Sequence, residues 1–142
     1  MEVSNEKLLT SWLKMVLAVN SERVATQLPY NEAVVCNLLM GHPNQQMTAT
    51  DLCGMMKMQK SLMNRTLTSL ESKKIIERIR SKEDKRLVLV KLVNDVNNIF
   101  MTQHEKTLNY VDKLVNRIGK DKVNEIIALF DSITNIAQEE NK

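Results

Sequence analysis

A predicted helix from about Gln59 to Ser72 presents two faces of different chemistry. Met63, Leu67 and Leu70 recur at helical spacing, which predicts that their face packs against a core. A solvated helix face usually mixes Glu with Lys, but the opposite face has no acidic residue before Glu71. It offers an ammonium, a guanidinium, an amide and two hydroxyls, groups that hydrogen-bond to base edges and phosphates. These side chains are Lys60, Ser61, Asn64, Arg65 and Thr68.

Positive charge is concentrated in the segment that contains this helix. Residues 57–91 hold eleven Lys and Arg against four Asp and Glu, a net charge of +7, whereas the whole chain carries +3. The rest of the chain is therefore acidic. This is the electrostatic pattern expected of a nucleic-acid-binding protein. The alternative for Arg65 is an ordinary solvated helix arginine, which its neighbours make the weaker interpretation.

Short elements on either side of this helix complete a compact unit. Thr48 is suited to cap a preceding helix, with Asp51 at the capping-box spacing, and Lys57 to Gln59 supply the turn. After the helix, two runs favour β-strands and enclose a charged loop. This order predicts a helix-turn-helix followed by a β-hairpin wing. The strands are Ile75 to Ile79 and Leu87 to Leu92, and the loop is Arg80 to Arg86.

Longer amphipathic helices are predicted at both ends of the chain. With 142 residues and only five Gly and Pro in total, the composition fits one mostly helical domain. The predicted fold class is therefore mainly α: an α+β winged helix with long N-terminal and C-terminal helices. The flanking helices are predicted at Ser4 to Leu28, Asn31 to Met40, Asn94 (as the cap) to Ile118, and from Asp121 onward, with a loop at Gly41 to Gln46 and Gly119 as a helix end.

Membrane proteins, secreted proteins and enzymes have no support in the sequence. No run of about 18 apolar residues exists and the N-terminal residues lack a signal-peptide core, so a cytoplasmic protein is expected. No nucleophile–base pair, Gly-rich phosphate loop or ligand cluster is present, so no enzyme, cofactor or metal is expected. Cys36 and Cys53 lie in apolar patterns and are predicted to be small core residues, with a thiol sensor as the alternative.

The segment Met47 to Leu92 resembles the MarR family of bacterial transcription regulators, and the order of elements agrees over nearly the whole chain. Two positions depart from the family pattern. Lys74 stands where Gly usually follows the recognition helix, and Gln59 stands where a capping Ser or Thr is common. The matching stretches are Met47–Cys53 at the helix start, Arg65 in mid-helix, Leu70–Arg78 at the helix exit and the Asp-x-Arg of the wing at Asp84–Arg86.

The resemblance implies that the wing unit binds double-stranded DNA. In the family, the recognition helix enters the major groove and the wing reaches the neighbouring minor groove. The five polar residues above would face the major groove, and Lys82, Lys85 and Arg86 would be the wing contacts. Asp84 would be repelled by phosphate and is better placed to hold Arg86. A winged helix can also be a protein-interaction module without DNA contact, an alternative that the charge of +7 disfavours.

The resemblance also implies a homodimer. Residues 1–28 and 94–142 would form the dimerisation helices and residues 29–93 the DNA-binding unit. The alternative is that the terminal helices pack on their own chain, but a compact wing unit cannot cover the apolar stripes of both. Most of the family are repressors that bind a pseudo-palindromic operator and are relieved by a small ligand, so this is the expected function. The half-sites would lie about 10–10.5 base pairs apart.

A ligand pocket, as in the family, would lie between the dimerisation helices and the DNA-binding unit. Nine methionines make an adaptable lining plausible, although a Met and Leu stripe at helical spacing is more often plain core. An aromatic or phenolic acid as the effector is a hypothesis drawn from the resemblance. The candidate pocket residues are Trp12, Met15, Val16, Tyr30, Met40, His42, Met55 and Met56.

Overall fold

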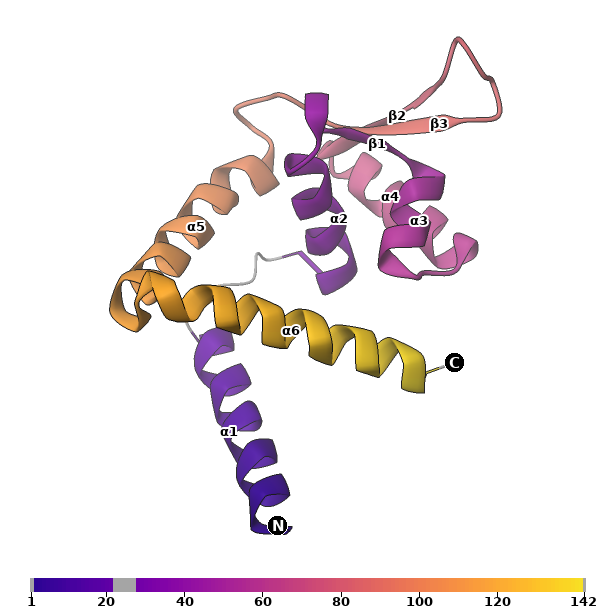
Figure 1. Cartoon of the computed structure of the whole chain (residues 1–142). Helices are drawn as coiled ribbons and strands as arrows, with labels where there is room; N and C mark the ends of the chain where they lie inside the picture. The colour runs from indigo at the N-terminus through magenta and orange to yellow at the C-terminus, as the bar shows by residue number, and fades with distance from the viewer. Residues whose placement is uncertain (1, 22–27, 142) are drawn as a thin grey trace. The chain divides into compact units, whose positions relative to one another are not determined.

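The computed structural model describes residues 2–21 and 28–141, in two compact units made of residues 1–105 and 106–142 (Figure 1). None of the described helices is long and apolar enough to cross a membrane. The elements are α1 (Glu2–Ser21), α2 (Tyr30–Met40), the 3-10 helix η1 (Pro43–Gln45), β1 (Gln46–Thr48), α3 (Ala49–Met56), α4 (Lys60–Ser72), β2 (Ile76–Arg80), β3 (Val88–Leu92), α5 (Ile99–Ile118) and α6 (Lys120–Glu140).

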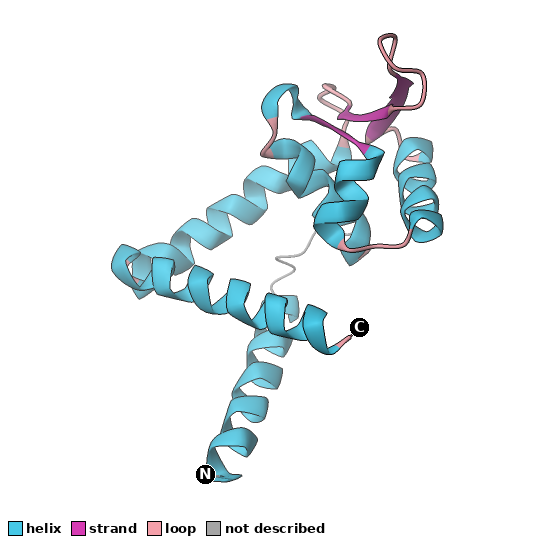
Figure 2. Cartoon of the chain, turned by 45° about the vertical axis from the view of Figure 1, so that its right-hand side comes forward, coloured by secondary structure: helices cyan, strands magenta, loops and turns pink. Residues whose placement is uncertain are grey.

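The first unit contains a three-stranded antiparallel sheet in the order β1-β3-β2. The sheet lies across one end of α2, α3 and α4 (Figures 1 and 2). Strand β1 was not predicted. It pairs Met47 with Val90 of β3, more than forty positions along the chain, so local pattern could not reveal it. The predicted helix-turn-helix with a wing is confirmed, and α4 is its recognition helix.

The core of this unit joins the three helices to the sheet. The predicted core residues Met63, Leu67 and Leu70 of α4 are all at most 1% exposed. Burying a side chain of this size stabilises the fold by roughly 1.5–3 kcal/mol relative to leaving it in water. The other buried apolar residues are Val35, Cys36, Leu39, Met47, Leu52, Ile75, Ile76, Val90, Leu92 and Phe100.

The start of the helix-turn-helix follows the predicted chemistry. The Thr48 hydroxyl accepts a hydrogen bond from the Asp51 backbone N–H at 3.0 Å, which caps α3. Lys57 ends α3 in the left-handed conformation with φ 48, and α4 begins three residues later. The turn at residues 57–59 is therefore confirmed.

The exit from the recognition helix is a Schellman motif built without glycine. The Lys74 N–H donates to the Glu71 carbonyl at 3.0 Å and the Ile75 N–H to the Leu70 carbonyl at 3.1 Å. Lys74 itself adopts the left-handed conformation, with φ 62. Because Ile75 belongs to this motif, β2 starts one residue later than predicted.

The predicted cap of α5 at Asn94 is wrong, and so is the helical placement of Val96. The chain leaves β3 in an irregular segment, α5 starts at Ile99, and Val96 is 86% exposed. Asn98 is the buried residue at this start. Its side-chain oxygen accepts from the Phe100 N–H at 3.0 Å, while its amide donates to the carbonyls of Ile75 and Val93 at 3.0 and 2.9 Å.

The two terminal helices agree with prediction within the described residues. Helix α1 ends at Ser21, and residues 22–27 of the predicted helix Ser4 to Leu28 lie outside the described part of the chain. Gly119 separates α5 from α6 with φ 103, a conformation that only glycine adopts readily. The predicted helix end at Gly119 is therefore confirmed.

Candidate nucleic-acid interface

The polar face predicted on the recognition helix is exposed. Lys60, Ser61, Asn64, Arg65 and Thr68 all point to solvent. Within the described residues, the ammonium of Lys60 and the guanidinium of Arg65 have no hydrogen-bond or ion-pair partner. Thr68 differs, because its hydroxyl already accepts a hydrogen bond from Arg78 at 3.1 Å. Four of the five predicted residues thus offer uncommitted groups to a ligand.

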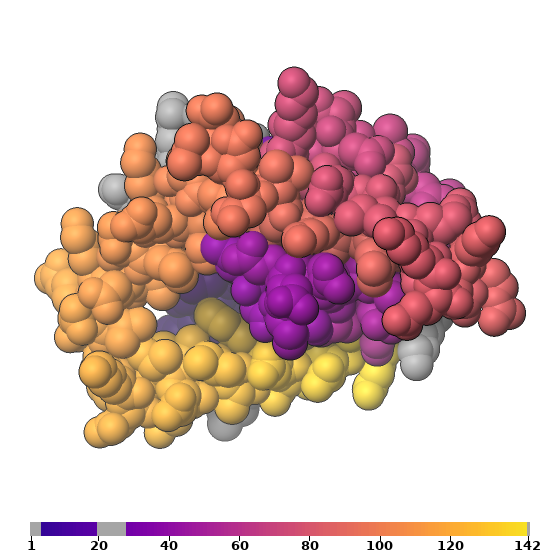
Figure 3. Space-filling view, turned by 90° about the horizontal axis from the view of Figure 1, so that it is seen from above, coloured from indigo at the N-terminus to yellow at the C-terminus, as the bar shows by residue number. Residues whose placement is uncertain are grey.

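The wing is closed by hydrogen bonds within its own loop. The Ser81 N–H donates to the Leu87 carbonyl, and the Leu87 N–H to the Asp84 carbonyl, both at 2.9 Å. The Arg80 guanidinium donates to the Lys85 carbonyl at 2.5 Å. Residues 81–87 stand at the right-hand edge of the view in Figure 3, and Lys82 and Lys85 are exposed. These hydrogen bonds fix the backbone of the loop that carries the exposed Lys82 and Lys85.

Asp84 holds Arg86, as predicted. The Arg86 Nε lies 3.1 Å from the Asp84 Oδ1, Nη2 lies 3.3 Å from Oδ2, and the Arg86 backbone N–H donates to Oδ1 at 3.0 Å. These side-chain and backbone hydrogen bonds from Arg86 lower the pKa of Asp84 below its usual range. The Arg86 side chain is nevertheless 90% exposed, so one edge of its guanidinium stays open to a ligand.

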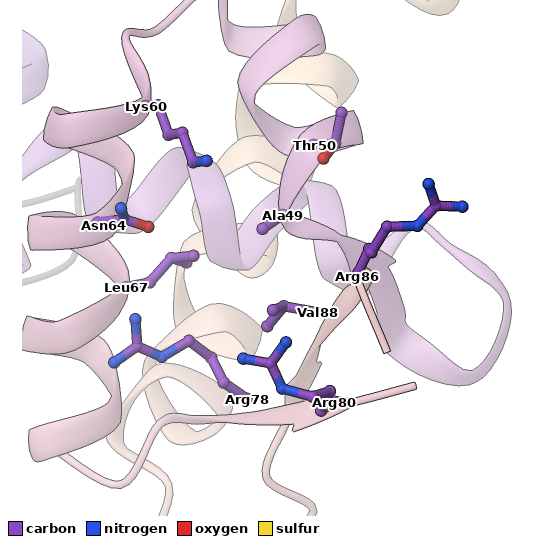
Figure 4. A pocket seen from close by; sticks show the side chains of 9 residues that line it. All are labelled: Ala49, Thr50, Lys60, Asn64, Leu67, Arg78, Arg80, Arg86 and Val88. Carbon is purple, nitrogen blue, oxygen red and sulfur yellow. The ribbon is translucent and has the colours of Figure 1, made fainter. Parts of the chain in front are cut away.

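A groove of about 420 Å³ lies between the start of α3, the first half of α4 and the two long strands (Figure 4). Four of its nine lining residues are Lys or Arg and none is acidic. From β2, the guanidinium groups of Arg78 and Arg80 extend toward α4, and the Lys60 ammonium reaches in from α4 (Figure 4). The groove lining is Ala49, Thr50, Lys60, Asn64, Leu67, Arg78, Arg80, Arg86 and Val88.

Sequence reasoning assigned Lys60, Asn64 and Arg86 to the interface but missed Thr50, Arg78 and Arg80. Arg78 and Arg80 occupy alternate positions of one strand, so they lie on one face of the sheet. This spacing was visible in the sequence. What it could not show was that this face of β2 turns toward the recognition helix.

Arg78 connects β2 to the recognition helix. Its Nη2 lies 2.9 Å and its Nε 3.3 Å from the Glu71 Oε1, and its backbone N–H donates to the Glu71 Oε2 at 3.1 Å. The Arg78 side-chain hydrogen bonds, with the backbone hydrogen bond second, lower the pKa of Glu71. Most of the Arg78 charge is therefore compensated within the protein, whereas Lys60 and Arg80 face the groove without a carboxylate partner among the described residues.

Cys36 is a core residue, as predicted, and has an acidic neighbour that was not predicted. Burial, and secondly the charge of Glu32, raise the pKa of the Cys36 thiol to about 12. Glu32 is itself 6% exposed and pairs with the Lys73 ammonium at 2.7 Å. Cys53 is half-buried against the core. No group of three or more His, Cys, Asp and Glu among the described residues could hold a metal ion.

The candidate pocket residues fall into two sets. Met40 and Met56 pack against the core, and His42 is partly buried with its Nδ1 3.0 Å from the Leu38 carbonyl. The others are exposed in the single chain, by between 38% and 66%: Trp12, Met15, Val16, Tyr30 and Met55.

The fold and the surface together define a winged-helix protein with a basic recognition face. The family model described as transcriptional regulator SarA/Rot matches residues 21–103. The chain therefore belongs to the SarA/Rot family of transcriptional regulators.

Several solved structures have a similar fold. FabT of Streptococcus pneumoniae in complex with DNA is 22% identical, with all of both chains covered and a TM-score of 0.65. A MarR family regulator from Streptomyces coelicolor in complex with DNA is 13% identical, with 93% of this chain and 86% of that chain covered and a TM-score of 0.70. The MarR protein of E. coli, as a mutant, is 20% identical, with 92% and 95% covered and a TM-score of 0.61. No curated protein sequence matches the chain. The chain thus has the winged-helix fold that the resemblance to the MarR family predicted.

Proposed function

We propose that the chain is a homodimeric repressor that binds a pseudo-palindromic operator and is released by a small ligand. One observation carries the DNA-binding part. Lys60, Asn64 and Arg86 line the same groove, and no acidic residue lines it (Figure 4). The exposed donors of α4, the groove and the wing at Arg86 therefore form one continuous basic surface. Two of the similar structures described above contain DNA.

Each part of this surface suits a different part of duplex DNA. Helix α4 would lie in the major groove, where Asn64 and Arg65 can make paired hydrogen bonds to a base edge. A backbone phosphate would lie along the groove, against Lys60 and Arg80. Arg86 would enter the minor groove, whose negative potential favours an exposed guanidinium. Lys82, Lys85 and Ser61 would add contacts to the sugar–phosphate backbone.

The dimer would form through the terminal helices. Seventeen large apolar residues of α1, α5 and α6 are more than a third exposed, and apolar side chains exposed in stripes mark interaction surfaces. The occupant we propose is a second copy of the same helices, which would place two recognition helices on one side of the duplex. Examples on the three helices are Trp12, Leu13, Leu108, Leu114, Phe130 and Ile133, exposed by 39% to 60%.

The effector we propose is an aromatic or phenolic acid that contacts the candidate pocket residues. The similar structure of NadR, 18% identical, is a complex with 4-hydroxyphenylacetate. A thermal-shift screen with such acids is expected to raise the melting temperature for at least one compound, which should also weaken DNA binding. If no compound shifts the melting temperature, release by ligands of this class is ruled out.

Selection of bound duplexes from a random library tests the central proposal. We expect an inverted repeat with half-site centres roughly 10–10.5 base pairs apart. Binding of the selected duplex, followed by fluorescence anisotropy, should weaken steeply as salt increases, because the basic surface displaces counterions from phosphates. A library that yields no enriched sequence, or binding that does not respond to salt, would contradict the proposal.

A further inference from the structure

Two ion pairs connect the C-terminal turn of α4 to its neighbours. The turn contributes the cation to one pair and the anion to the other. Toward α2, the Lys73 ammonium of this turn lies 2.7 Å from the Glu32 carboxylate. Toward β2, Glu71 of the same turn accepts hydrogen bonds from the side chain and the backbone of Arg78. The helix end is thereby connected to the two elements that flank it.

Each connection is constrained by its burial or by its geometry. The Glu32 side chain is 8% exposed, and a carboxylate taken so far out of water is tolerated only with a partner such as Lys73. Arg78 contacts the helix at two successive turns, because its Nη2 donates both to Glu71 and to the Thr68 hydroxyl at 3.1 Å. A planar guanidinium bound at several points restricts rotation as well as distance.

The other end of α4 lacks comparable polar contacts. Gln59 precedes the helix without a side-chain capping bond, and within the described residues no ion pair connects the first turn to another element. The groups that would read bases, including Asn64 and Arg65, lie in this first half. At 1.5 Å per residue, Asn64 and Arg65 lie about 11 Å from the C-terminal end of α4, so a tilt of about 10° about that end moves them by about 2 Å.

We propose that Glu32 and Arg78 are positioning residues that set the axis of α4 and thereby the sequence preference of the regulator. This inference rests on the proposed DNA-binding function. Hydrogen bonds to base edges fail with a displacement of about 2 Å, whereas attraction to phosphates tolerates it. Loss of either ion pair should therefore reduce the preference for the operator more than it reduces binding to random DNA.

The test compares the affinity for the selected operator with that for random duplex in Glu32→Gln and Arg78→Gln. We expect the ratio of the two affinities to fall by about tenfold or more in both variants, the size of one lost base contact. The two substitutions change the net charge in opposite directions, so a purely electrostatic effect would move their DNA affinities in opposite directions. Lys74→Asn is the matched control: it removes a positive charge beside Lys73 without breaking an ion pair, and should keep the ratio.

A ratio is insensitive to partial unfolding, because an unfolded fraction lowers both affinities equally. If Arg78→Gln does not fold, Arg78→Lys keeps the charge but not the multiple hydrogen bonds, and its ratio should still fall. A wild-type protein without sequence preference would overturn the proposed function and the inference with it. A wild-type protein with a preference that the folded Glu32 and Arg78 variants retain would overturn the inference alone.

Discussion

Arg65 and Arg86 are both exposed arginines of the basic surface, but only Arg86 has an ion-pair partner among the described residues. Arg65 has no partner among the described residues, whereas Asp84 holds one edge of Arg86. We expect Arg65→Ala to cost about 1–3 kcal/mol of operator binding and to relax the preference at one base pair, as for a direct base contact. Arg86→Ala should instead weaken binding to all sequences and lower the salt dependence by roughly one unit. Binding titrations with single-base operator variants at several salt concentrations measure both effects.

Asp84→Asn is the control for the wing assignment. It removes a negative charge from the DNA-facing surface, so simple electrostatics predicts tighter binding. If Asp84 acts by orienting Arg86, binding should weaken instead. Arg65 and Arg86 variants that both bind the operator like the wild type would show that the helix and wing assignments are wrong together.

Cys36 should be unreactive in the folded protein. Its pKa is raised to about 12 from an ordinary value of 9.0, which leaves far less of the reactive thiolate at neutral pH. In a Cys53→Ala protein, the remaining thiol should react with an aromatic disulfide reagent only as fast as the chain unfolds.

The raised pKa of Cys36 also means that the free energy of unfolding falls between pH 9 and pH 12, where the unfolded thiol ionises and the folded one does not. Rapid reaction of folded Cys53→Ala protein would favour the thiol-sensor alternative.

At the scale of elements, the junction between β3 and α5 depends on one buried asparagine. Asn98 bonds to three backbone groups from three segments, so Asn98→Ala should cost about 2–4 kcal/mol of unfolding free energy, since buried backbone groups lose their partners. Urea denaturation measures this. Asn94 is exposed at the position that the sequence suggested as the cap, and Asn94→Ala should change stability by less than about 0.5 kcal/mol. Equal effects of the two substitutions would contradict this assignment.

For the molecule as a whole, the proposed operator binding depends on a second copy of the chain. Phe130 of α6 is 54% exposed within the apolar stripe of that helix. If the stripe is a dimer interface, Phe130→Glu should produce a monomer, because the interface would bury an unpaired charge. Asn124→Glu adds the same charge at an exposed polar position of α6 and should remain dimeric. Sedimentation equilibrium distinguishes the two, and a monomeric wild-type protein would exclude the dimer.

Operator binding should follow the oligomeric state. A dimer engages two half-sites together, so the Phe130→Glu monomer should bind the inverted repeat far more weakly than Asn124→Glu does. Its affinity for a single half-site should stay close to that of one wild-type half-site contact. Unchanged binding of the full operator by a monomer would contradict the twofold arrangement.

Local periodicity and charge in the sequence were enough to predict several parts of the molecule. Helical spacing separated the buried face of α4, with Met63 and Leu67, from the exposed face with Asn64 and Arg65, because both faces follow from one helical repeat. The Thr48 cap and the pairing of Arg86 with Asp84 were also predictable, since the partners lie within three residues of each other. These local relations sufficed to indicate a winged helix.

Which distant residues meet depends on how the elements pack against one another. In the sequence, nothing distinguishes Glu32 from an exposed polar residue of α2. Only packing brings it to Lys73, 41 positions later in the chain. The groove joins Thr50, Lys60 and Arg80 from three elements, and the cap of α5 shifted to Asn98 because carbonyls of Ile75 and Val93 were within reach. Such contacts arise when elements are folded against one another, and no short-range pattern encodes them.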